Sequence, residues 1–374
     1  MIYLDSAATT MQKPPTVSAA VCRAMECMAS PGRGSHRPAM RAAETVFQCR
    51  EVAARMFEAD QPDYVVFTSG ATHGLNIAIK SAVEPGSSVL ITGYEHNAVT
   101  RPLKAIPNVS VHVAESPLFC PDLLLEQVRD KLKYGVSTVI CTHVSNVFGY
   151  VLPVSEISRL CRANGAVLIV DVSQSAGCLP VSMKEWGAEF VAMPGHKGLY
   201  GPQGTGILLC ANEKVKPLIE GGTGSASAIQ TMPEYLPDRL EAGTHNVPGI
   251  AGLLEGLKFV ERRGISSILA HERQLALYAA RGLEGIPGIE VFFARGLKNQ
   301  AGVVSFRMDG IDCETVAERL GQEDIAVRAG LHCAPLAHQS AGTLESGTVR
   351  ASFSAFNTLY DAQRLIESVS RISP

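Results

Sequence analysis

Lys197 is the residue of this chain whose surroundings best suit covalent amine chemistry. It lies in a glycine-rich stretch, residues 192–206, directly after a short apolar run, and has no charged neighbour nearer than His196. Glycines permit left-handed backbone angles and the close approach of a bulky ligand. Upstream, the apolar segment Val167–Asp171 predicts a buried strand that ends in a carboxylate. Open α/β sheets bind their ligands at that end of the strands.

Together, Lys197 and Asp171 indicate an enzyme that uses pyridoxal phosphate. The lysine would hold the cofactor as a Schiff base, and the aspartate would keep the ring nitrogen protonated so that the ring accepts electrons. A structural aspartate and a mobile loop lysine would explain these two residues equally well. Other parts of the chain must decide between these alternatives.

The composition is that of a compact globular protein. The chain has 374 residues, enough for two domains, of which 46% are hydrophobic and 18% charged. No apolar run is long enough to span a bilayer, and a net charge of −3 without a basic stripe gives no support to nucleic-acid binding. The N-terminus lacks the features of a secretory signal, so we expect a cytoplasmic protein. The ten cysteines show no metal-ligand spacing, so we expect reduced thiols and no metal site.

Strand and helix patterns alternate through the first two thirds of the chain. Apolar strand patterns occur at residues 64–68, 88–92, 109–113, 136–141 and 167–171. Because helical or loop sequence separates them, they predict an α/β fold with a doubly wound, mostly parallel sheet. We expect this large cofactor-binding domain to span residues 15–249.

A smaller α+β domain is predicted for the rest of the chain. Helical patterns at residues 250–263 and 265–283 precede strand patterns at 289–293 and 303–306 and a helix at 313–320. We expect residues 250–374 to form this domain together with residues 1–14.

Polar residues follow several of the predicted strands. The strand-to-helix turn at Ser69–Thr72 could hold a phosphate with the free N–H groups of the helix start, although Ser and Thr are also ordinary N-caps. His96 could stack on a planar cofactor, Asn146 could bind one of its oxygens, and Gln174 could donate to its phenolic oxygen. Taken singly, each is better explained as an ordinary loop side chain.

Six segments in one order resemble the class V aminotransferase family of fold-type I pyridoxal phosphate enzymes, and within it the cysteine desulfurase and selenocysteine lyase branch. The segments are Leu4–Thr10, Ser69–Thr72, Glu95–Asn97, Val144–Asn146, Asp171–Gln174 and Gly195–Lys197. The resemblance covers nearly the whole chain. It implies the fold of these enzymes and pyridoxal 5'-phosphate as the cofactor.

The resemblance also implies roles for single residues. Lys197 would hold the cofactor, His96 would stack on its ring, and Asp171 would pair with its ring nitrogen. The phenolic oxygen and the phosphate would be bound by a further set: Asn146, Gln174, Ala71, Thr72 and His196.

Substrate and subunit contacts are implied in the same way. The substrate would be bound by Ala8, Asn146 and Arg350; an isolated arginine at the end of a strand pattern suits an α-carboxylate. A motif similar to Glu241–Thr244 lets a threonine of one subunit reach the phosphate of the other. The resemblance therefore implies a homodimer in which Thr244 contributes to the partner's site.

Cys333 differs from the other cysteines, most of which lie in apolar strand or helix patterns. It follows His332 in a loop between Gly330 and Pro335. A thiolate is nucleophilic and a neighbouring imidazole can exchange a proton with it, although a loop cysteine without a role is the alternative. Within the resemblance, this segment is similar to the desulfurase loop that carries the persulfide-forming cysteine. We therefore expect conversion of L-cysteine to L-alanine, with a persulfide on Cys333 that passes to an acceptor protein.

Other functions stay open. A selenocysteine lyase would use L-selenocysteine, a transaminase or epimerase would leave Cys333 idle, and a scaffold would need neither Lys197 nor Asp171. Two residues depart from the family pattern. Pro194 stands where many relatives carry a phosphate-binding Ser or Thr, and Leu331 stands where close relatives often have a second histidine.

Overall fold

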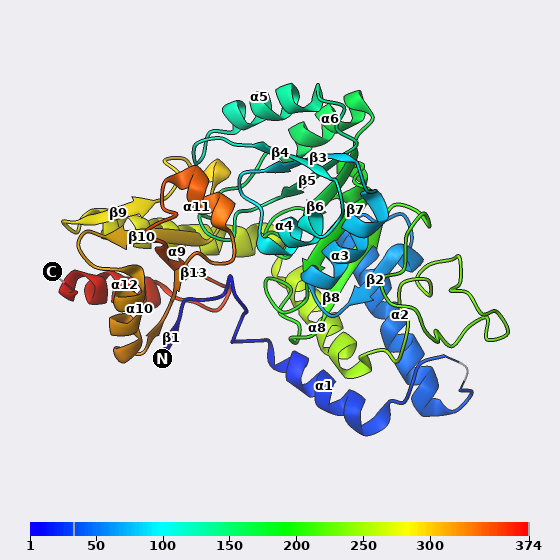
Figure 1. Cartoon of the computed structure of the whole chain (residues 1–374). Helices are drawn as coiled ribbons and strands as arrows, with labels where there is room; N and C mark the ends of the chain where they lie inside the picture. Colours follow the sequence, from blue (N-terminus) through cyan, green and yellow to red (C-terminus); the bar gives the residue numbers. More distant parts are fainter. Residues whose placement is uncertain (33, 373–374) are drawn as a thin grey trace.

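The structure is a computed structural model that describes residues 1–32 and 34–372. The last two residues of the predicted small domain therefore lie outside the described residues. The chain forms a seven-stranded sheet between helices and, beside it, a four-stranded sheet with its own helices (Figure 1).

The large sheet has the strand order β2-β8-β7-β6-β5-β3-β4. Its strands are β2 (Val65–Thr68), β3 (Ser88–Thr92), β4 (Ser110–Ala114), β5 (Thr138–Thr142), β6 (Val167–Asp171), β7 (Phe190–Pro194) and β8 (Gly206–Cys210). Only β8 runs against its neighbours; the other six strands share one direction. The predicted α/β fold with a mostly parallel sheet is confirmed. As a result, the turns that leave six strands gather at one edge of the sheet.

Side chains alternate along each strand, and each face of the sheet has its own hydrophobic core. Leu168 and Val170 of β6 pack with one group of helices, whereas Ile169 between them packs with another group. The first group is α2 (Arg37–Phe57), α5 (Pro121–Leu132), α6 (Val154–Asn164) and α8 (Val247–Arg263); the second is α3 (Ala71–Ala82) and α4 (Asn97–Lys104). Burial on both faces explains why these strands are apolar along their whole length.

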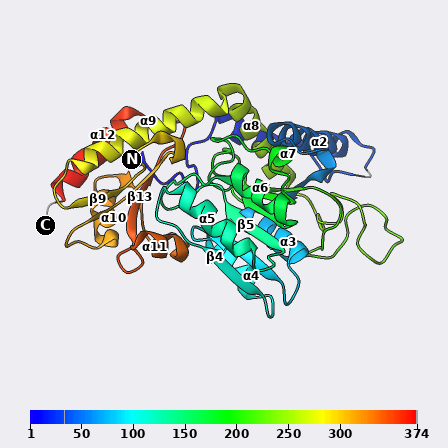
Figure 2. The same cartoon turned by 90° about the horizontal axis from the view of Figure 1, so that it is seen from above.

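The second sheet is antiparallel, in the order β12-β13-β10-β9. Its strands are β9 (Ile289–Phe292), β10 (Val303–Met308), β12 (Arg328–Gly330) and β13 (Thr348–Ser352). It shares a core with the helices α9 (Ile265–Glu284), α10 (Cys313–Gln322) and α12 (Leu359–Arg371), and α9 and α12 lie side by side (Figure 2).

The N-terminal strand β1 (Ile2–Tyr3) pairs in parallel with β11 (Ile325–Ala326) next to this second core. The first strand β1 and the last helix α12 lie in the same part of the molecule (Figure 1). The boundaries of the two predicted domains stay a prediction.

Several elements were not predicted from the sequence. They are the short elements β7, β8, β11, β12, α7 (Met183–Trp186) and α11 (Pro335–Ala341), and the longer C-terminal helix α12. The remaining helix is α1 (Pro15–Cys27). Short elements give few repeats of a periodic pattern, so neighbours in space decide them more than local sequence does.

Candidate active site

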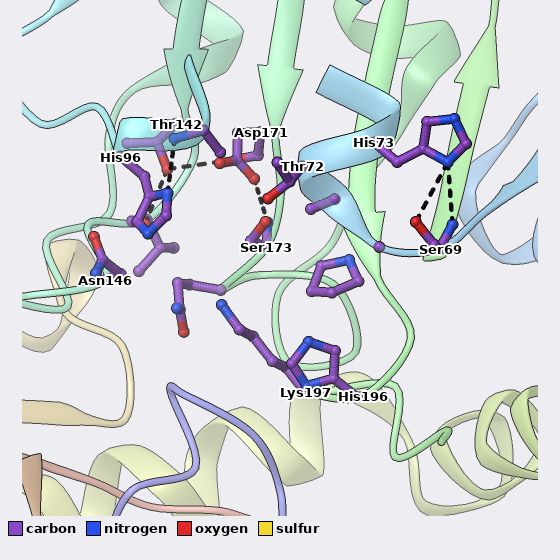
Figure 3. A pocket seen from close by; sticks show the side chains of 16 residues that line it. Ser69, Thr72, His73, His96, Thr142, Asn146, Asp171, Ser173, His196 and Lys197 are labelled. Atoms are coloured by element: carbon purple, nitrogen blue, oxygen red, sulfur yellow. Dashed lines mark hydrogen bonds between the residues drawn. The ribbon is translucent and has the colours of Figure 1, made fainter. Parts of the chain in front are cut away.

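A cavity of about 260 Å³ lies at the edge of the large sheet where the parallel strands end (Figure 3). The predicted site residues that line it are Ala71, Thr72, His96, Asn146, Asp171, Gln174, His196 and Lys197. They lie at or just after the carboxyl ends of β2, β3, β5, β6 and β7. The sheet thus brings together most of the residues singled out in the sequence, at the edge where open α/β sheets bind ligands.

Lys197 projects into this cavity (Figure 3). Burial, the largest influence, lowers the pKa of Lys197 to about 8, although the negative charge of Asp171 acts in the opposite direction. The Nζ atom forms no hydrogen bond with any residue that the structure describes. A lysine with such a pKa is partly uncharged near neutral pH, and the uncharged amine is the nucleophile.

The loop that carries Lys197 packs directly on the turn that follows Asp171. A Cβ atom on Gly198 would lie 2.4 Å from the main-chain oxygen of Ala176, and one on Gly177 would lie 2.1 Å from the main-chain oxygen of Gly198. No side chain fits in either place. The glycines of this stretch are therefore explained by the close approach of two backbone segments, which fixes the loop beneath the cavity.

Asp171 is 3% exposed, and its Oδ1 accepts a 2.8 Å hydrogen bond from the Ser173 amide (Figure 3). Nearby, the buried Oε1 of Glu95 accepts hydrogen bonds from the Thr92 hydroxyl at 2.5 Å and the Thr142 amide at 2.9 Å. Burial, as the main cause, raises the pKa of Glu95 to about 8. Glu95 is therefore mostly uncharged at pH 7 and adds no full negative charge beside Asp171.

His96 caps the N-terminus of α4, where its Nδ1 accepts a 3.0 Å hydrogen bond from the Ala98 amide. Burial is the largest cause that lowers the pKa of His96, and the positive charges of Lys197 and Arg101 act in the same direction. The ring is therefore neutral at pH 7 with its proton on Nε2. Its position in the cavity wall leaves it able to stack on a planar ligand.

The N-terminus of α3 opens into the same cavity. No side chain of the described residues caps this helix, so its first N–H groups are available to an anion. Thr72 lies in its first turn, and His196 is also in the cavity wall, with its Nδ1 3.0 Å from the Thr9 hydroxyl. Burial lowers the pKa of His196 to about 4, so this ring is neutral at pH 7.

Three polar residues of the cavity wall were not among the predicted site residues: His73, Thr142 and Ser173. The Nδ1 of His73 accepts a 3.3 Å hydrogen bond from the Ser69 amide (Figure 3). Its place one helical turn after Ser69 was the sequence signal that could have identified it. Pro194 also lines the cavity and offers no donor there.

Cys333 does not line this cavity but an adjoining hollow of about 370 Å³. The two spaces share Thr72, His96 and Ala98, so the thiol lies next to the cavity of Lys197. Cys333 is exposed and adopts a left-handed backbone angle, φ 57°. The structure thus places the predicted nucleophile at the rim of the site.

Two hydrogen bonds fix the loop of Cys333 to the large sheet. The Asn97 amide donates to the main-chain oxygen of Cys333 at 2.8 Å, and the Asn146 side chain donates to that of His332 at 2.8 Å. His332 itself is buried and donates from Nε2 to the main-chain oxygen of Thr348 at 3.1 Å. Burial is the main cause that lowers the pKa of His332 to about 2, so the ring is neutral.

Arg350 lies close to the site without lining its cavity. Its guanidinium is 2% exposed and donates to Asp5 Oδ1 at 2.8 Å and to the main-chain oxygen of Asn146 at 2.9 Å. Its Nε has no hydrogen-bond partner among the described residues. In the structure, Arg350 therefore holds the N-terminal segment against the turn after β5.

Two other predicted residues lie apart from the cavity of Lys197. Ala8 is outside its wall, but the neighbouring Ala7 accepts a 3.0 Å hydrogen bond from the Gln174 side chain. Thr244 is exposed and lines a different cavity of about 370 Å³, which shares Ser69 and His73 with the first. The predicted action of Thr244 in a second subunit stays a prediction.

Neither a metal-binding group of side chains nor a membrane-spanning helix is found among the described residues. Residues 1–32 and 34–372 contain no group of three His, Cys, Asp or Glu side chains that could hold a metal ion. In the same part of the chain, no helix has the length and apolar character needed to cross a membrane.

Comparisons with known proteins match this chain to the class V aminotransferase family and to cysteine desulfurases within it. The family model described as aminotransferase class-V matches residues 2–365. A probable cysteine desulfurase of Pyrococcus abyssi is 32% identical over 98% of this chain and 92% of its own length. One of Mycolicibacterium paratuberculosis is 34% identical over the whole chain, which spans 55% of that longer protein. The solved apo structure of a cysteine desulfurase from Thermococcus onnurineus has a TM-score of 0.91 and 30% identity, covering 99% of this chain and 94% of that one.

Proposed function

Because the chain belongs to the aminotransferase class-V family, we propose that it is a pyridoxal-phosphate-dependent cysteine desulfurase that receives the sulfur of L-cysteine on Cys333. The family resemblance and the fold class expected from the sequence are confirmed by the family model and the superposition. The chain is accordingly an enzyme. Substrate, cofactor, subunit contacts and the roles of single residues belong to the proposal.

The residues present fit pyridoxal 5'-phosphate. An uncapped helix N-terminus, a buried carboxylate, a neutral imidazole and an amine of lowered pKa all face one cavity. A phosphate suits the N–H groups at the start of α3, and a protonated ring nitrogen suits Asp171. When bound, this cofactor would act as an electron sink that weakens bonds at the α-carbon and β-carbon of an amino acid.

The residues of the chain would share the work as follows. Lys197 would bind the cofactor covalently and, once released by the substrate, remove the α-proton with its uncharged amine. His96 would cover the ring face, while Ala71, Thr72 and His196 would hold the phosphate. Asn146 and Gln174 would address the phenolic oxygen.

Substrate binding would use Arg350, with Ala8 and Asn146 near the same end of the site. The buried guanidinium of Arg350 supports this assignment, because its Nε has no partner among the described residues and a carboxylate would supply one once the side chain opens to the cavity. The fixed guanidinium would then orient the substrate before any bond changes.

The thiolate of Cys333 would attack the sulfur atom of the substrate. A bond forms between the two sulfur atoms as the bond between sulfur and the β-carbon breaks, and the electron pair of that bond stays with carbon. Protonation of that carbon leads to L-alanine, and Cys333 keeps the sulfur as a persulfide. No external oxidant is needed, because one carbon is reduced as the transferred sulfur is oxidised.

The position of Cys333 carries this proposal. Six of the ten cysteines are buried, whereas Cys333 is exposed at a rim that shares Thr72 and His96 with the cavity of Lys197. A transaminase or epimerase has no use for a nucleophilic thiol at this place.

The test is alanine release from L-cysteine in the presence of a thiol reductant. Wild type should release alanine and Cys333→Ala should not, while Cys22→Ala, which alters the other exposed cysteine, should keep the wild-type rate. Equal rates for wild type and Cys333→Ala would contradict the proposal. Alanine from L-selenocysteine but not from L-cysteine would instead identify a selenocysteine lyase.

We further infer that the enzyme works as a homodimer and passes its sulfur to an acceptor. Thr244 supports the dimer, since it is exposed and its cavity adjoins that of Lys197 through Ser69 and His73. Sedimentation of the purified protein tests the dimer; a monomer at all concentrations would contradict it.

A further inference from the structure

The hollow beside Cys333 carries a charge that the proposed chemistry on L-cysteine does not use. Two of its lining residues, Lys80 and Arg101, are exposed cations, and none of the described residues that line it is acidic. They lie in the last turns of α3 and α4. Neither forms an ion pair with any residue in the described part of the chain. Both charges are thus free to meet an anion that enters from solvent.

Asn97 also offers hydrogen-bond donors to this hollow. The Asn97 side chain uses its oxygen to accept from Thr100, which leaves its amide N–H groups available. The positive charge of Arg101 reaches the shared wall, because it is one of the causes that lower the pKa of His96. The hollow therefore suits carboxylates better than neutral or cationic groups.

Cys333 cannot readily carry its sulfur away from this place. Its loop joins β12 to α11 within four residues and is bonded on both sides of the peptide, at the oxygens of His332 and Cys333. A sulfur acceptor must therefore come to the exposed thiol, and the hollow is the space beside it. Its volume of about 370 Å³ is that of a site for a small molecule.

We propose that this hollow binds a small thiol carrying carboxylates, with Lys80 and Arg101 as its specificity residues, and that this thiol removes the sulfur from Cys333. The inference rests on the proposed desulfurase function. The thiolate of the acceptor attacks the outer sulfur of the Cys333 persulfide and forms a bond with it. The bond to Cys333 breaks, Cys333 leaves as a thiolate, and the acceptor departs as a persulfide, so no further oxidant or reductant is required.

The first experiment measures the site without any sulfur chemistry. Cofactor-saturated protein is alkylated with anionic iodoacetate or neutral iodoacetamide, and the rate at Cys333 is followed by peptide mass spectrometry. The preference is the ratio of the iodoacetate rate to the iodoacetamide rate at Cys333. This ratio should fall roughly five-fold in Lys80→Ala and roughly five-fold in Arg101→Ala, as expected for loss of a surface charge interaction. It should also fall as salt is added.

Lys104→Ala is the matched control, because Lys104 lies in the same last turn of α4 but outside the hollow. This variant should keep the wild-type preference at Cys333, and Cys22 should show no change in any variant. An unchanged preference at Cys333 in the Lys80→Ala/Arg101→Ala double variant would overturn the inference, whatever reaction the enzyme catalyses.

The second experiment measures sulfur transfer. Cys333 is loaded from L-cysteine, the excess is removed, and loss of the persulfide is followed with mercaptosuccinate, 2-mercaptoethanol or cysteamine at equal thiolate concentration. Mercaptosuccinate, which carries two carboxylates, should react fastest. Of the three rates, only that of mercaptosuccinate should fall in Lys80→Ala and in Arg101→Ala. Failure to load Cys333 would count against the desulfurase function, whereas normal loading with equal rates for all three thiols would count against the acceptor site.

Discussion

The side chain of Asn146 donates a 2.8 Å hydrogen bond to the main-chain oxygen of His332, 186 residues further along the chain. Asn146 belongs to the turn after β5, and His332 immediately precedes Cys333. This bond and the one from the Asn97 amide are the two polar contacts that tie the cysteine loop to the large sheet. The geometry between Cys333 and the cavity of Lys197 depends on them.

Replacement of Asn146 by alanine should loosen the loop of Cys333. The lost hydrogen bond leaves the His332 oxygen without this donor, which costs about 1 kcal/mol. Hydrogen exchange of residues 331–334 in the cofactor-free protein should become faster by about five-fold or more.

Asn97→Ala is the control for this prediction, because Asn97 holds the loop through its main-chain amide and that bond survives the change. Exchange in the loop should stay at the wild-type rate. Equal loosening in both variants would show that the Asn146 side chain does not hold the loop.

Lys197 should set the pH dependence of cofactor capture. Its pKa of about 8 means that the amine loses its proton as the pH rises through 8, and only the uncharged form reacts. When pyridoxal phosphate is added to cofactor-free protein, the rate of appearance of yellow absorbance should rise with pH and reach half its maximum near pH 8. Lys197→Ala should show no such absorbance.

Lys13 is the necessary comparison, since burial also lowers its pKa to about 8 and its Nζ lies near the same loop, 3.3 Å from the His196 oxygen. Lys13→Met should keep the midpoint of wild type. A midpoint that moves in this variant would assign the titration to Lys13 instead.

Glu95 should make the protein less stable as the pH rises. Its folded-state pKa of about 8 lies above the ordinary value of 4.5, so the folded state holds a proton that the unfolded state releases between these values. The stabilisation is complete at low pH and is lost as the pH rises through 8. The free energy of unfolding should therefore be measured with urea at pH 5 and pH 9 for wild type and Glu95→Gln. Relative to wild type, the variant should be more stable at pH 9 than at pH 5 by at least about 1 kcal/mol.

The glutamine can still accept from Thr92 and Thr142, so the variant should fold. Glu95→Ala, which removes the acceptor, should be destabilised at both pH values because those two donors lose their partner. A constant difference between wild type and Glu95→Gln across this range would contradict the assignment.

The ion pair between Arg50 and Glu241 should be a major stabilising contact beneath the Thr244 segment. It is bidentate and nearly buried, with distances of 2.9 and 2.5 Å, and the Phe67 amide also donates to Glu241. Removing one partner leaves a buried charge, so Arg50→Ala should lower the free energy of unfolding by about 3–5 kcal/mol. Arg55→Ala, which breaks the exposed pair with Glu261, should cost less than about 1 kcal/mol.

Acid should weaken the same pair. Burial by itself raises the pKa of Glu241, but the charge of Arg50 and the hydrogen bonds from His245 and Arg50 outweigh it and leave the pKa lowered. The stabilisation is thus present at neutral pH and is lost as the pH falls through the lowered pKa. Arg50→Ala should accordingly differ less from wild type in strong acid; an undiminished difference would exclude this linkage.

The sequence by itself was enough to group Asp171, His96 and Lys197 at the cavity that they line. Each of Asp171, His96 and Lys197 follows an apolar strand pattern within a few residues, and strand direction in an alternating α/β chain brings such turns to one edge. The local sequence therefore predicted that these three side chains share one edge of the sheet. The same logic missed His73 and Thr142, since a hydroxyl or a second histidine near a turn is also common where no ligand binds.

Only the tertiary structure decided which distant residues join this edge. Arg350 lies in the second sheet and Cys333 in the loop after its strand β12. Their positions depend on the register of that sheet and on contacts with Asp5, Asn97 and Asn146 across 186 to 345 residues of chain. It also showed that Thr244 lies apart from the cavity of Lys197 in the same chain, and that Lys80 and Arg101 stand unpaired beside the thiol. Local sequence patterns carry strand and helix propensity, whereas side-chain contacts between separate units arise from how those units pack.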